Sequence, residues 1–513
     1  MTIRPDRTAV PLAMNRDEFR RLGHDLVDRV AEFLDTMPQR PVTPAKSPDA
    51  VRRVLDAAAP LPERGAEPAE LLGHTSELLF DNSLFNGHPR FFGYVTASPT
   101  PIGILGDFLA SAVNANVGAW TLSPMATEIE AQTVRWIADL VGYPDSGGLL
   151  VSGGNMANLT GFLAARAAVA PWDVRAAGAA SPDGGRLRVY ASAETHTWIQ
   201  KAADVSGLGT DCIRWIPTDA ELRMDLGALR AAIVRDEEEG DHPMMVVGTA
   251  GSVSTGAVDP LTEIAAIARD RGLWFHVDGA YGGLAVAVPG VPRDLEGLRL
   301  ADSVALDPHK WLYAPLEAGC LLVRDPETLR RAFAYHPPYY HFGVEAINYL
   351  DLGTQNSRGF RALKVWLALQ HAGREGYVRT IGDDIRLAQR LFSLIDAHPE
   401  FEACTQRLSI TTFRYVPSDL PPDMDAPQRE RYLNRLNQAL LDRVQRSGEA
   451  FVSNAVLGGR YVLRPCIVNF NTQEDDIDAL PEILARLGRA THADLWGTGD
   501  LDPNENPPRL SVA

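Results

Sequence analysis

Between residues 100 and 330, short apolar segments alternate with helical patterns, and this alternation restricts the possible folds more than any other feature of the sequence. A helix is expected over Pro260–Arg271, because proline favours the first turn of a helix and Gly272 favours its end. Alternating strands and helices predict an α/β fold with a mostly parallel sheet, which binds ligands at the carboxyl ends of its strands. Six segments have the length and apolar character of strands: Leu149–Ser152, Arg188–Ala191, Met244–Thr249, Leu273–Val277, Ser303–Leu306 and Gly319–Val323.

The chain is long enough for more than one domain, and its pattern changes on both sides of this region. Residues 1–90 are predicted to form a helical segment that packs at a dimer interface or, alternatively, on its own large domain. Residues 91–375 would form that large domain. Five apolar residues of the N-terminal segment recur at helical spacing: Phe19, Leu22, Leu26, Val30 and Phe33.

The C-terminal part predicts a smaller α+β domain over residues 376–495. It would contain a helix at Gly382–Ile395 and strands near Ile410–Tyr415 and Tyr461–Phe470. Residues 496–513 are rich in Asp, Asn, Pro and Gly, so a disordered tail is expected there.

Composition argues against several classes of protein. The formal net charge of −17 opposes nucleic-acid binding, which needs a clustered basic surface. No apolar run reaches the roughly 18 residues of a membrane helix, and the N-terminus lacks the apolar run of a secretory signal. We therefore expect a cytoplasmic protein without a metal site or disulfide framework, because no CxxC pair occurs among its cysteines: Cys212, Cys320, Cys404 and Cys466.

Two polar motifs follow predicted strands and are candidates for ligand binding. The sequence SGGNMAN at residues 152–158 opens a helix, where glycine allows close backbone approach and free amides can hold a phosphate. A glycine turn that binds nothing is the alternative. His196 follows the strand Arg188–Ala191 and could be a core residue, a proton carrier or a plate against a flat ring.

Two further motifs carry opposite charges at strand ends. Asp278, within HVDGAY, needs a cationic or hydrogen-bonding partner, which could be a protonated pyridine nitrogen or a structural salt bridge. Lys310, within DPHKW, could lose its proton through desolvation and form an imine. A lysine that extends its ammonium group to solvent is the usual alternative.

Together these residues resemble the group II pyridoxal-5′-phosphate (PLP) dependent decarboxylases, which act on aromatic L-amino acids, histidine or glutamate. The resemblance extends from about residue 15 to 490 and includes HPRFF at 88–92, HVDGAY and DPHKW, with 32 residues from Asp278 to Lys310. It implies PLP fold type I and a homodimer whose active sites lie between the subunits.

The resemblance also implies a role for each motif residue. Lys310 would hold PLP as a Schiff base, and Asp278 would pair with the pyridinium nitrogen. His196 and Ala280 would lie against opposite faces of the cofactor ring. The remaining contacts to the cofactor would come from Gly154, Asn155, Thr249 and His309.

The implied reaction converts an L-amino acid to its amine and CO2. Tyr349 lies 11 residues before Phe360, where family decarboxylases carry a tyrosine on a mobile loop that is thought to protonate Cα. Oxidative relatives have phenylalanine there, so Tyr349 favours an amine product. An aminotransferase of the same fold and a non-catalytic PLP-binding regulator are the alternatives, and no basic helix-turn-helix segment supports the second.

The substrate is predicted to be an aromatic amino acid. Gly118 would enlarge the pocket, whereas Asn116 could serve a polar substrate such as glutamate or 2,4-diaminobutyrate. Arg464 is a candidate partner for the substrate carboxylate. Asp307 stands where many relatives have asparagine beside the phosphate, so its anion would point away or be compensated. Three aromatic residues are predicted to contact the substrate: Phe92, Tyr94 and Trp120.

Overall fold

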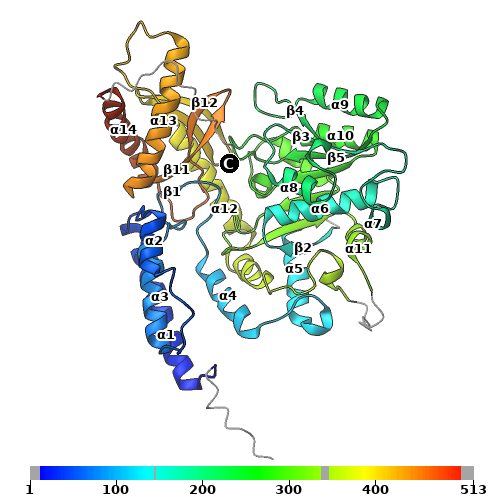
Figure 1. Cartoon of the computed structure of the whole chain (residues 1–513), viewed down its shortest axis with the longest axis horizontal. Coiled ribbons are helices and arrows are strands. Elements are labelled where there is room, and N and C mark those ends of the chain that lie inside the picture. The colour runs from blue at the N-terminus through cyan, green and yellow to red at the C-terminus, as the bar shows by residue number, and fades with distance from the viewer. Residues whose placement is uncertain (1–11, 144–145, 337–345, 498–513) are drawn as a thin grey trace, which may run out of the picture.

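A computed structural model describes residues 12–143, 146–336 and 346–497 (Figure 1). Its larger sheet has seven strands in the order β2-β8-β7-β6-β5-β3-β4. Neighbours from β4 through β3, β5 and β6 to β7 are parallel, whereas β8 is antiparallel to β7 and β2. The strands are β2 (Gly147–Val151), β3 (Leu187–Ser192), β4 (Ile213–Ile216), β5 (His242–Thr249), β6 (Trp274–Asp278), β7 (Ser303–Leu306) and β8 (Gly319–Val323). All six predicted strands are confirmed, and only β4 was not predicted.

Helices cover this sheet, and α6 packs against β6, β7 and β8. The predicted helix after Pro260 is confirmed as α10, and it ends at Gly272, whose φ of +68° is readily adopted by glycine. The helices of the large part are α4 (Pro101–Val113), α5 (Pro124–Leu140), α6 (Gly154–Val169), α7 (Val174–Ala177), α8 (Trp198–Val205), α9 (Leu226–Glu238), α10 (Leu261–Arg271) and α11 (Glu327–Phe333). Short 3-10 helices are η2 (Met37–Gln39), η3 (Trp120–Leu122), η4 (Thr210–Cys212), η5 (Gly282–Ala287), η6 (Arg293–Leu300) and η7 (Tyr349–Asp351).

The smaller sheet has five strands in the order β1-β11-β12-β10-β9. Its strands are β1 (Phe91–Phe92), β9 (Phe401–Arg407), β10 (Ile410–Tyr415), β11 (Phe451–Leu457) and β12 (Arg460–Arg464). Because β1 pairs in parallel with β11, residues 91–92 belong to this sheet and not to the large domain in which the sequence placed them. The strand predicted near Tyr461–Phe470 is shorter than expected, since β12 ends at Arg464 just before a proline.

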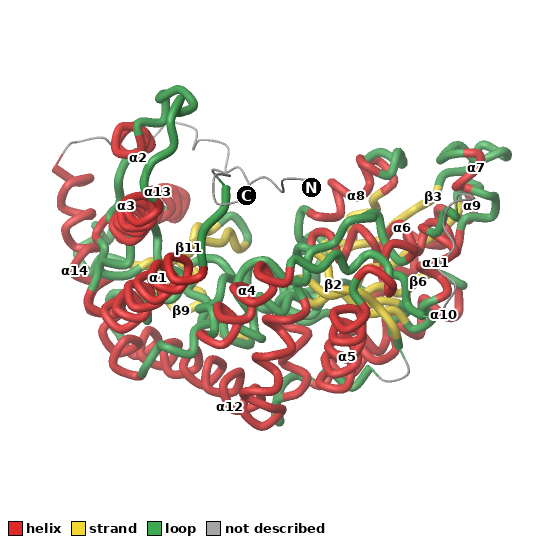
Figure 2. The backbone as a smooth tube through the Cα atoms, turned by 90° about the horizontal axis from the view of Figure 1, so that it is seen from below, coloured by secondary structure: helices red, strands yellow, loops and turns green. Residues whose placement is uncertain are grey.

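Helix α12 (Ala362–Ala397) connects the large domain, which contains the seven-stranded sheet, to the small domain, which contains the five-stranded sheet (Figure 2). It contacts α4 and α5 on one side and β9, β10 and α14 on the other. The predicted helix Gly382–Ile395 is its second half, and the predicted domain boundary at residue 375 falls two residues after Gly373, where the helix is interrupted at φ +64°. The small domain is completed by α13 (Ala426–Ser447) and α14 (Glu474–Gly497). The predicted tail beyond Gly497 lies outside the described residues.

The N-terminal segment is helical, as predicted. It comprises α1 (Arg16–Thr36), α2 (Pro48–Leu55) and α3 (Pro68–Asn82), shown in blue in Figure 1. Phe33 of α1 stacks on Phe80 of α3 with ring centroids 4.2 Å apart. Phe19 and Leu79 are each 56% exposed, so this helical pair keeps apolar surface that its own chain does not cover. Among the helices of the described residues, none is long and apolar enough to cross a bilayer.

A buried ion pair fixes the segments around the large sheet. Arg358 Nη2 lies 2.5 Å from Glu130 Oε1, and the two side chains are 2% and 0% exposed. The same guanidinium donates to the carbonyl oxygens of Val117 (2.9 Å) and Leu150 (2.6 Å). The pair therefore links α5, β2 and the segment around residue 117 to the chain just before α12.

Loss of this pair should be costly. We predict that Arg358→Met lowers the free energy of unfolding by about 3–5 kcal/mol, because the Glu130 carboxylate would stay buried without its cation. Urea denaturation followed by circular dichroism measures the change. Arg386→Met is a matched control that breaks an exposed pair with Glu474 and should cost less than about 1 kcal/mol. Equal losses in the two variants would contradict the role of the buried pair.

Candidate active site

The polar residues predicted from the sequence gather at one edge of the large sheet. β5 ends at Thr249 and β6 ends at Asp278. β7 is followed directly by Asp307 and leads to Lys310, while β3 leads to His196. Because β3, β5, β6 and β7 run parallel, their carboxyl ends lie at the same edge of the sheet. The strand order therefore brings together residues that are far apart in the sequence.

Lys310 lies beside an acid. Its Nζ is 3.0 Å from Asp307 Oδ2, and His309 Nε2 is 3.6 Å from the same oxygen. The other oxygen, Asp307 Oδ1, is buried and has no hydrogen-bond partner in the described structure. The sequence left two alternatives for Asp307: its carboxylate points away from the phosphate, or another group compensates its charge. The structure shows the second, because the carboxylate lies beside Lys310 and His309 and the lysine compensates its charge.

Asp278 is held by two hydrogen bonds at the end of β6. Trp198 Nε1 donates to Asp278 Oδ2 at 2.7 Å, and the backbone N–H of Ala280 donates to Oδ1 at 3.2 Å. Asp278 is 7% exposed, so these donors replace water for a carboxylate that is almost buried. Sequence reasoning missed Trp198, although a tryptophan two residues after His196 offers an N–H that needs a partner when buried.

His196 and His276 have different surroundings. His196 is partly exposed, yet the protein around it removes water from the ring, and this desolvation lowers its pKa. The Asp278 carboxylate opposes the effect. His276 is fully buried, and burial lowers its pKa to about 4. Its Nδ1 and Nε2 lie 2.7 Å from Ser303 Oγ and Asn158 Oδ1, respectively. His276 is therefore a neutral structural residue that joins α6 to β6 and β7.

A close-packed cradle lies where the phosphate is expected. Gly154 opens α6, and a Cβ atom there would lie 2.7 Å from Asp307 Oδ2 and 2.9 Å from the Cβ of Ala280. Only glycine fits so close an approach. The amides at the start of α6, with the exposed Asn155 beside them, can receive an anion. Thr249 Oγ1 is buried without a partner in the described structure, so its hydroxyl can still bond a ligand.

These groups fit PLP. The amine of Lys310 can bond covalently to an aldehyde, the carboxylate of Asp278 can pair with a protonated ring nitrogen, and the start of α6 can hold a phosphate. The Asp307 carboxylate, in contrast, is unfavourable for phosphate binding, because it adds negative charge near that phosphate.

The structure contradicts the mobile-loop position predicted for Tyr349. The residue lies in η7, is 1% exposed and packs in the core below the guanidinium of Arg358, 4.6 Å from the ring centroid. Burial raises the pKa of Tyr349 well above its ordinary value, which makes the phenol a weaker acid. Part of the predicted loop, residues 337–345, lies outside the described residues.

Of the three predicted substrate contacts, the structure places only Phe92 against expectation. Phe92 is fully buried in β1 within the core of the small domain, so its ring cannot reach a substrate. Trp120 donates from Nε1 to Glu128 at 2.9 Å and is held through its backbone by Asn348. Tyr94 is 56% exposed and remains a possible contact.

Asn116 and Gly118 have structural roles that the sequence did not predict. Asn116 Oδ1 accepts the backbone N–H groups of Gly118 (3.2 Å) and Arg358 (3.1 Å), so this side chain closes a loop. A Cβ at Gly118 would lie 2.3 Å from the carbonyl oxygen of Asn356. Glycine is therefore required there by the approach of the neighbouring chain, and neither residue is evidence for the size or polarity of a pocket.

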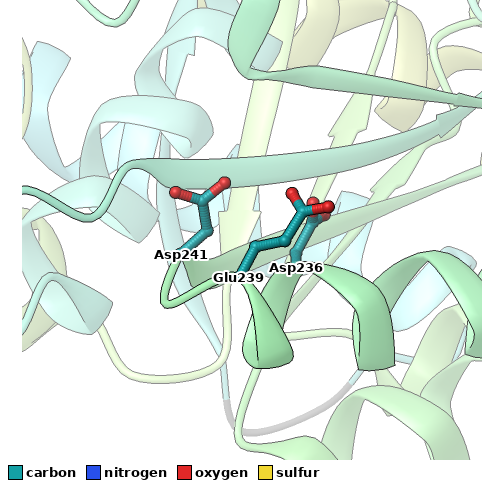
Figure 3. Close-up of side chains that lie close together, drawn as sticks. All are labelled: Asp236, Glu239 and Asp241. Carbon is teal, nitrogen blue, oxygen red and sulfur yellow. The ribbon is translucent and has the colours of Figure 1, made fainter.

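An acidic cluster lies away from these residues, at the end of α9 and the start of β5 (Figure 3). Asp236, Glu239 and Asp241 come close enough to share an ion. However, Arg214 Nη2 lies 2.6 Å from Asp236, and Arg188 Nε lies 2.5 Å from Asp241. Two of the three carboxylates are thus already neutralised, and the cluster is part of an ion-pair network.

Comparison with known proteins agrees with the site. Fold and site together define a PLP-binding α/β protein. Residues 48–416 match the family described as "Pyridoxal-dependent decarboxylase conserved domain", and the chain belongs to this family. It is 34% identical to an aromatic-L-amino-acid decarboxylase of Bacillus atrophaeus, over 91% of this chain and 94% of the relative. It is 30% identical to a phenylacetaldehyde synthase of Arabidopsis thaliana, over 90% and 94%.

The fold also resembles a solved structure that contains the cofactor. The structure of Oryza sativa TDC with PLP and tryptamine superposes with a TM-score of 0.85 at 28% identity, covering 95% of this chain and 99% of that one. The predicted family and fold type I are therefore confirmed. The chain is a PLP-dependent carboxy-lyase that acts on amino acids, and PLP is its cofactor.

The bond between Trp198 and Asp278 gives a first test of the site. We predict that Trp198→Phe lowers kcat/KM and PLP affinity roughly 10- to 100-fold, because a hydrogen bond to a charged acceptor contributes about 1.5–3 kcal/mol. Steady-state kinetics and cofactor titration measure both effects. Trp215→Phe, at an exposed position on β4, is the matched control and should match the wild type. Wild-type values for Trp198→Phe would show that this bond does not support the carboxylate.

The position of Tyr349 gives a second test. Tyr349→Phe should leave the product an amine and change kcat by less than about threefold, since the phenol is buried in the core and is a weakened acid. Mass spectrometry of the products, read for amine and aldehyde together, measures the outcome. Aldehyde as the main product would restore Tyr349 as the proton donor.

Proposed function

We propose that this enzyme decarboxylates an aromatic L-amino acid to the corresponding amine, with Lys310 as the residue that binds PLP covalently. The observation that carries the proposal is the placement of an amine and a carboxylate, Lys310 and Asp278, at the ends of the adjacent parallel strands β7 and β6 beside the start of α6. In the reaction RCH(NH3⁺)COO⁻ + H⁺ → RCH2NH3⁺ + CO2, the bond from Cα to the carboxylate carbon breaks and a proton replaces it.

The residues of the chain have distinct tasks in this proposal. PLP, when bound, supplies an electron-withdrawing ring for the electron pair left at Cα. Asp278 keeps the ring nitrogen protonated, and Trp198 fixes the orientation of that carboxylate. His196, with its lowered pKa, offers a neutral ring beside the cofactor at neutral pH. Lys310 would hold the cofactor through its amine, at the position where the amino group of the substrate reacts.

Arg464 is proposed to bind the carboxylate of the substrate. It is 3% exposed, and its Nη1 donates to the carbonyl oxygen of Tyr94 at 3.2 Å, while Nε has no partner in the described structure. Burial lowers its pKa, and the described groups that act on its charge are Cys466, Tyr281 and Tyr94, none of which is a carboxylate. A buried cation without an anion supports a site for a charged ligand.

An aromatic substrate is supported by Tyr94 and by the relatives. Tyr94 is exposed, and its carbonyl oxygen accepts a hydrogen bond from Arg464. A substrate carboxylate bound to Arg464 would therefore place the substrate side chain near the Tyr94 ring. Relatives named for aromatic substrates include the Bacillus atrophaeus decarboxylase and a tyrosine decarboxylase of Oryza sativa. The similarity to phenylacetaldehyde synthase makes oxidative formation of an aldehyde the second candidate reaction.

We also propose a homodimer in the cytoplasm. Apolar side chains are exposed on α1, α3 and α4, where a second copy could cover them, among them Phe19, Leu71, Leu79, Leu105 and Phe108. The four cysteines are free, which agrees with a reducing compartment.

The decisive experiment combines a product assay with chemical trapping. Purified protein with PLP is incubated with tryptophan, tyrosine, phenylalanine, glutamate and 2,4-diaminobutyrate, and amines and aldehydes are identified by mass. We expect amines from the aromatic substrates. Lys310→Ala should reduce turnover more than about 100-fold, whereas Lys201→Ala, at an exposed lysine, should not.

Borohydride reduction followed by peptide mapping should place the pyridoxyl group on Lys310. A tag on another residue, or none, would refute the proposed site. Amine from glutamate alone would refute the aromatic substrate, and aldehyde as the main product would favour the second candidate reaction.

A further inference from the structure

The turn that carries Lys310 has an unusual conformation. Tyr313 adopts φ +50°, in the left-handed region, which is unfavourable for a residue other than glycine. The turn is closed by hydrogen bonds from the N–H of Tyr313 to the carbonyl oxygen of Lys310 (3.0 Å) and from Ala314 to Pro308 (3.2 Å). A strained conformation persists only where surrounding contacts impose it, so the contacts of this turn matter for the position of the lysine.

Helix α12 supplies those contacts. Asp384, on its second half, is 2% exposed, and its Oδ2 accepts hydrogen bonds from Trp311 Nε1 (3.0 Å) and the Tyr313 hydroxyl (2.7 Å). Tyr377, two turns earlier on the same helix, donates its hydroxyl to the carbonyl oxygen of Leu312 (3.1 Å). Three consecutive residues after Lys310 are thus bonded to one helix.

The part of α12 that holds the turn packs against both domains, because Tyr377 and Ile381 lie in the core of the large sheet and Leu387 in the core of the small domain. Beyond the interruption at Gly373, the helix packs against β9, β10 and α14. The backbone N–H of Asn469, in the loop after β12, is a further donor to Asp384. The Asp384 carboxylate therefore connects the turn that carries Lys310, in the large domain, to helix α12 and to the loop of Asn469 after β12.

A second connection of the same kind begins beside Asp278. Tyr281, three residues further along the chain, packs on Trp311 with ring centroids 4.8 Å apart. Its hydroxyl lies 2.8 Å from Ser409 Oγ and accepts the backbone N–H of Ser409 at 3.0 Å. Ser409 lies in the turn between β9 and β10 of the small domain. Both cofactor-binding segments are thus attached to the small domain through an aromatic residue.

If Asp384 served only to fill space in the core, a carboxylate would be unfavourable at its buried position. Burial raises the pKa of Asp384 to about 7, so the fold retains an acid whose charge the interior disfavours. Among the described residues, the titratable side chains that act on its charge are Tyr313, Asp383 and Cys466, and none of these is a cation. An apolar residue would fill the space without this penalty, which points to a task that needs the hydrogen-bond acceptor.

We propose that Asp384 is a positioning residue that transmits the placement of the small domain to Lys310 through Trp311 and Tyr313. This inference rests on the proposed function of Lys310. The small domain also carries Arg464, at the end of β12, so the same contact sets the amine of one domain relative to the guanidinium of the other. Asp384 therefore acts on the reaction through the lysine turn without touching cofactor or substrate.

The test compares three variants of the holoenzyme. Asp384→Leu removes the acceptor and keeps the branched shape of the side chain, Asp384→Asn keeps one acceptor oxygen, and Asp383→Asn removes the neighbouring exposed carboxylate as a matched control. The measurements are the dissociation constant of PLP, the pH midpoint of the absorbance of the bound cofactor, kcat and KM separately, and thermal unfolding by circular dichroism.

For Asp384→Leu we expect PLP binding about tenfold weaker, a pH midpoint displaced by about 0.5 units or more, and kcat about tenfold lower with KM within about twofold. Asp384→Asn should recover most of each value, and Asp383→Asn should match the wild type. An unchanged pH midpoint and kcat in a folded Asp384→Leu enzyme would overturn the inference, even if its thermal stability fell.

If Asp384→Leu does not fold, Tyr313→Phe removes a single donor and should displace the pH midpoint from the wild-type value by a smaller amount than that expected for Asp384→Leu. An unchanged midpoint in Tyr313→Phe would equally overturn the inference. Failure of the proposed function is distinguishable, because the wild-type enzyme would then form no amine and give no pyridoxyl tag on Lys310.

Discussion

Parallel hydrogen bonding between β3, β5, β6 and β7 is the constraint on which the rest of this structure depends. Parallel strands point their carboxyl ends to one edge, so every loop that leaves them begins there. His196, Thr249, Asp278 and Lys310 lie at or after the ends of four strands that are separated by long stretches of chain, and the sheet brings these strand ends together. The buried core of the large domain keeps this edge in place, and long-range contacts such as those of Trp198 with Asp278 and of Trp311 with Asp384 then position the segments of the site.

Much of this arrangement follows from the sequence because it depends on local pattern. The six predicted strands are short apolar runs bounded by turn residues, and each appears at its expected place. Helix α10 shows the same agreement, since Pro260 and Gly272 act within a few residues of the chain. The motif residues can be placed for the same reason, because they lie at strand ends. Once the strands are predicted, the edge of the sheet at which these residues lie is predicted as well. The family resemblance added the cofactor, which composition and periodicity do not specify.

Where prediction failed, the deciding contact came from a distant part of the chain. Phe92 was expected at the substrate, yet residues beyond 450 pair with it and draw it into the core of the small domain. Gly118 suggested an open pocket, but the carbonyl oxygen of Asn356 occupies the space that a side chain would need. Tyr349 was assigned by counting along the sequence, and Arg358 with its buried partner fixes it instead in the interior. Trp198 was overlooked for the same reason, because nothing local shows that its indole reaches Asp278.

The parallel pairing of β1 with β11 has a consequence for how the protein is made. The first strand of the small sheet leaves the ribosome about 360 residues before its partner (Phe91 against Phe451) and has to wait for the last part of the chain. A fragment that starts after residue 100 would lack this strand and leave β11 as an open sheet edge, a surface that recruits other chains. The small domain is thus discontinuous in the sequence, and cutting the chain between residues 92 and 451 separates two strands that pair in the folded protein.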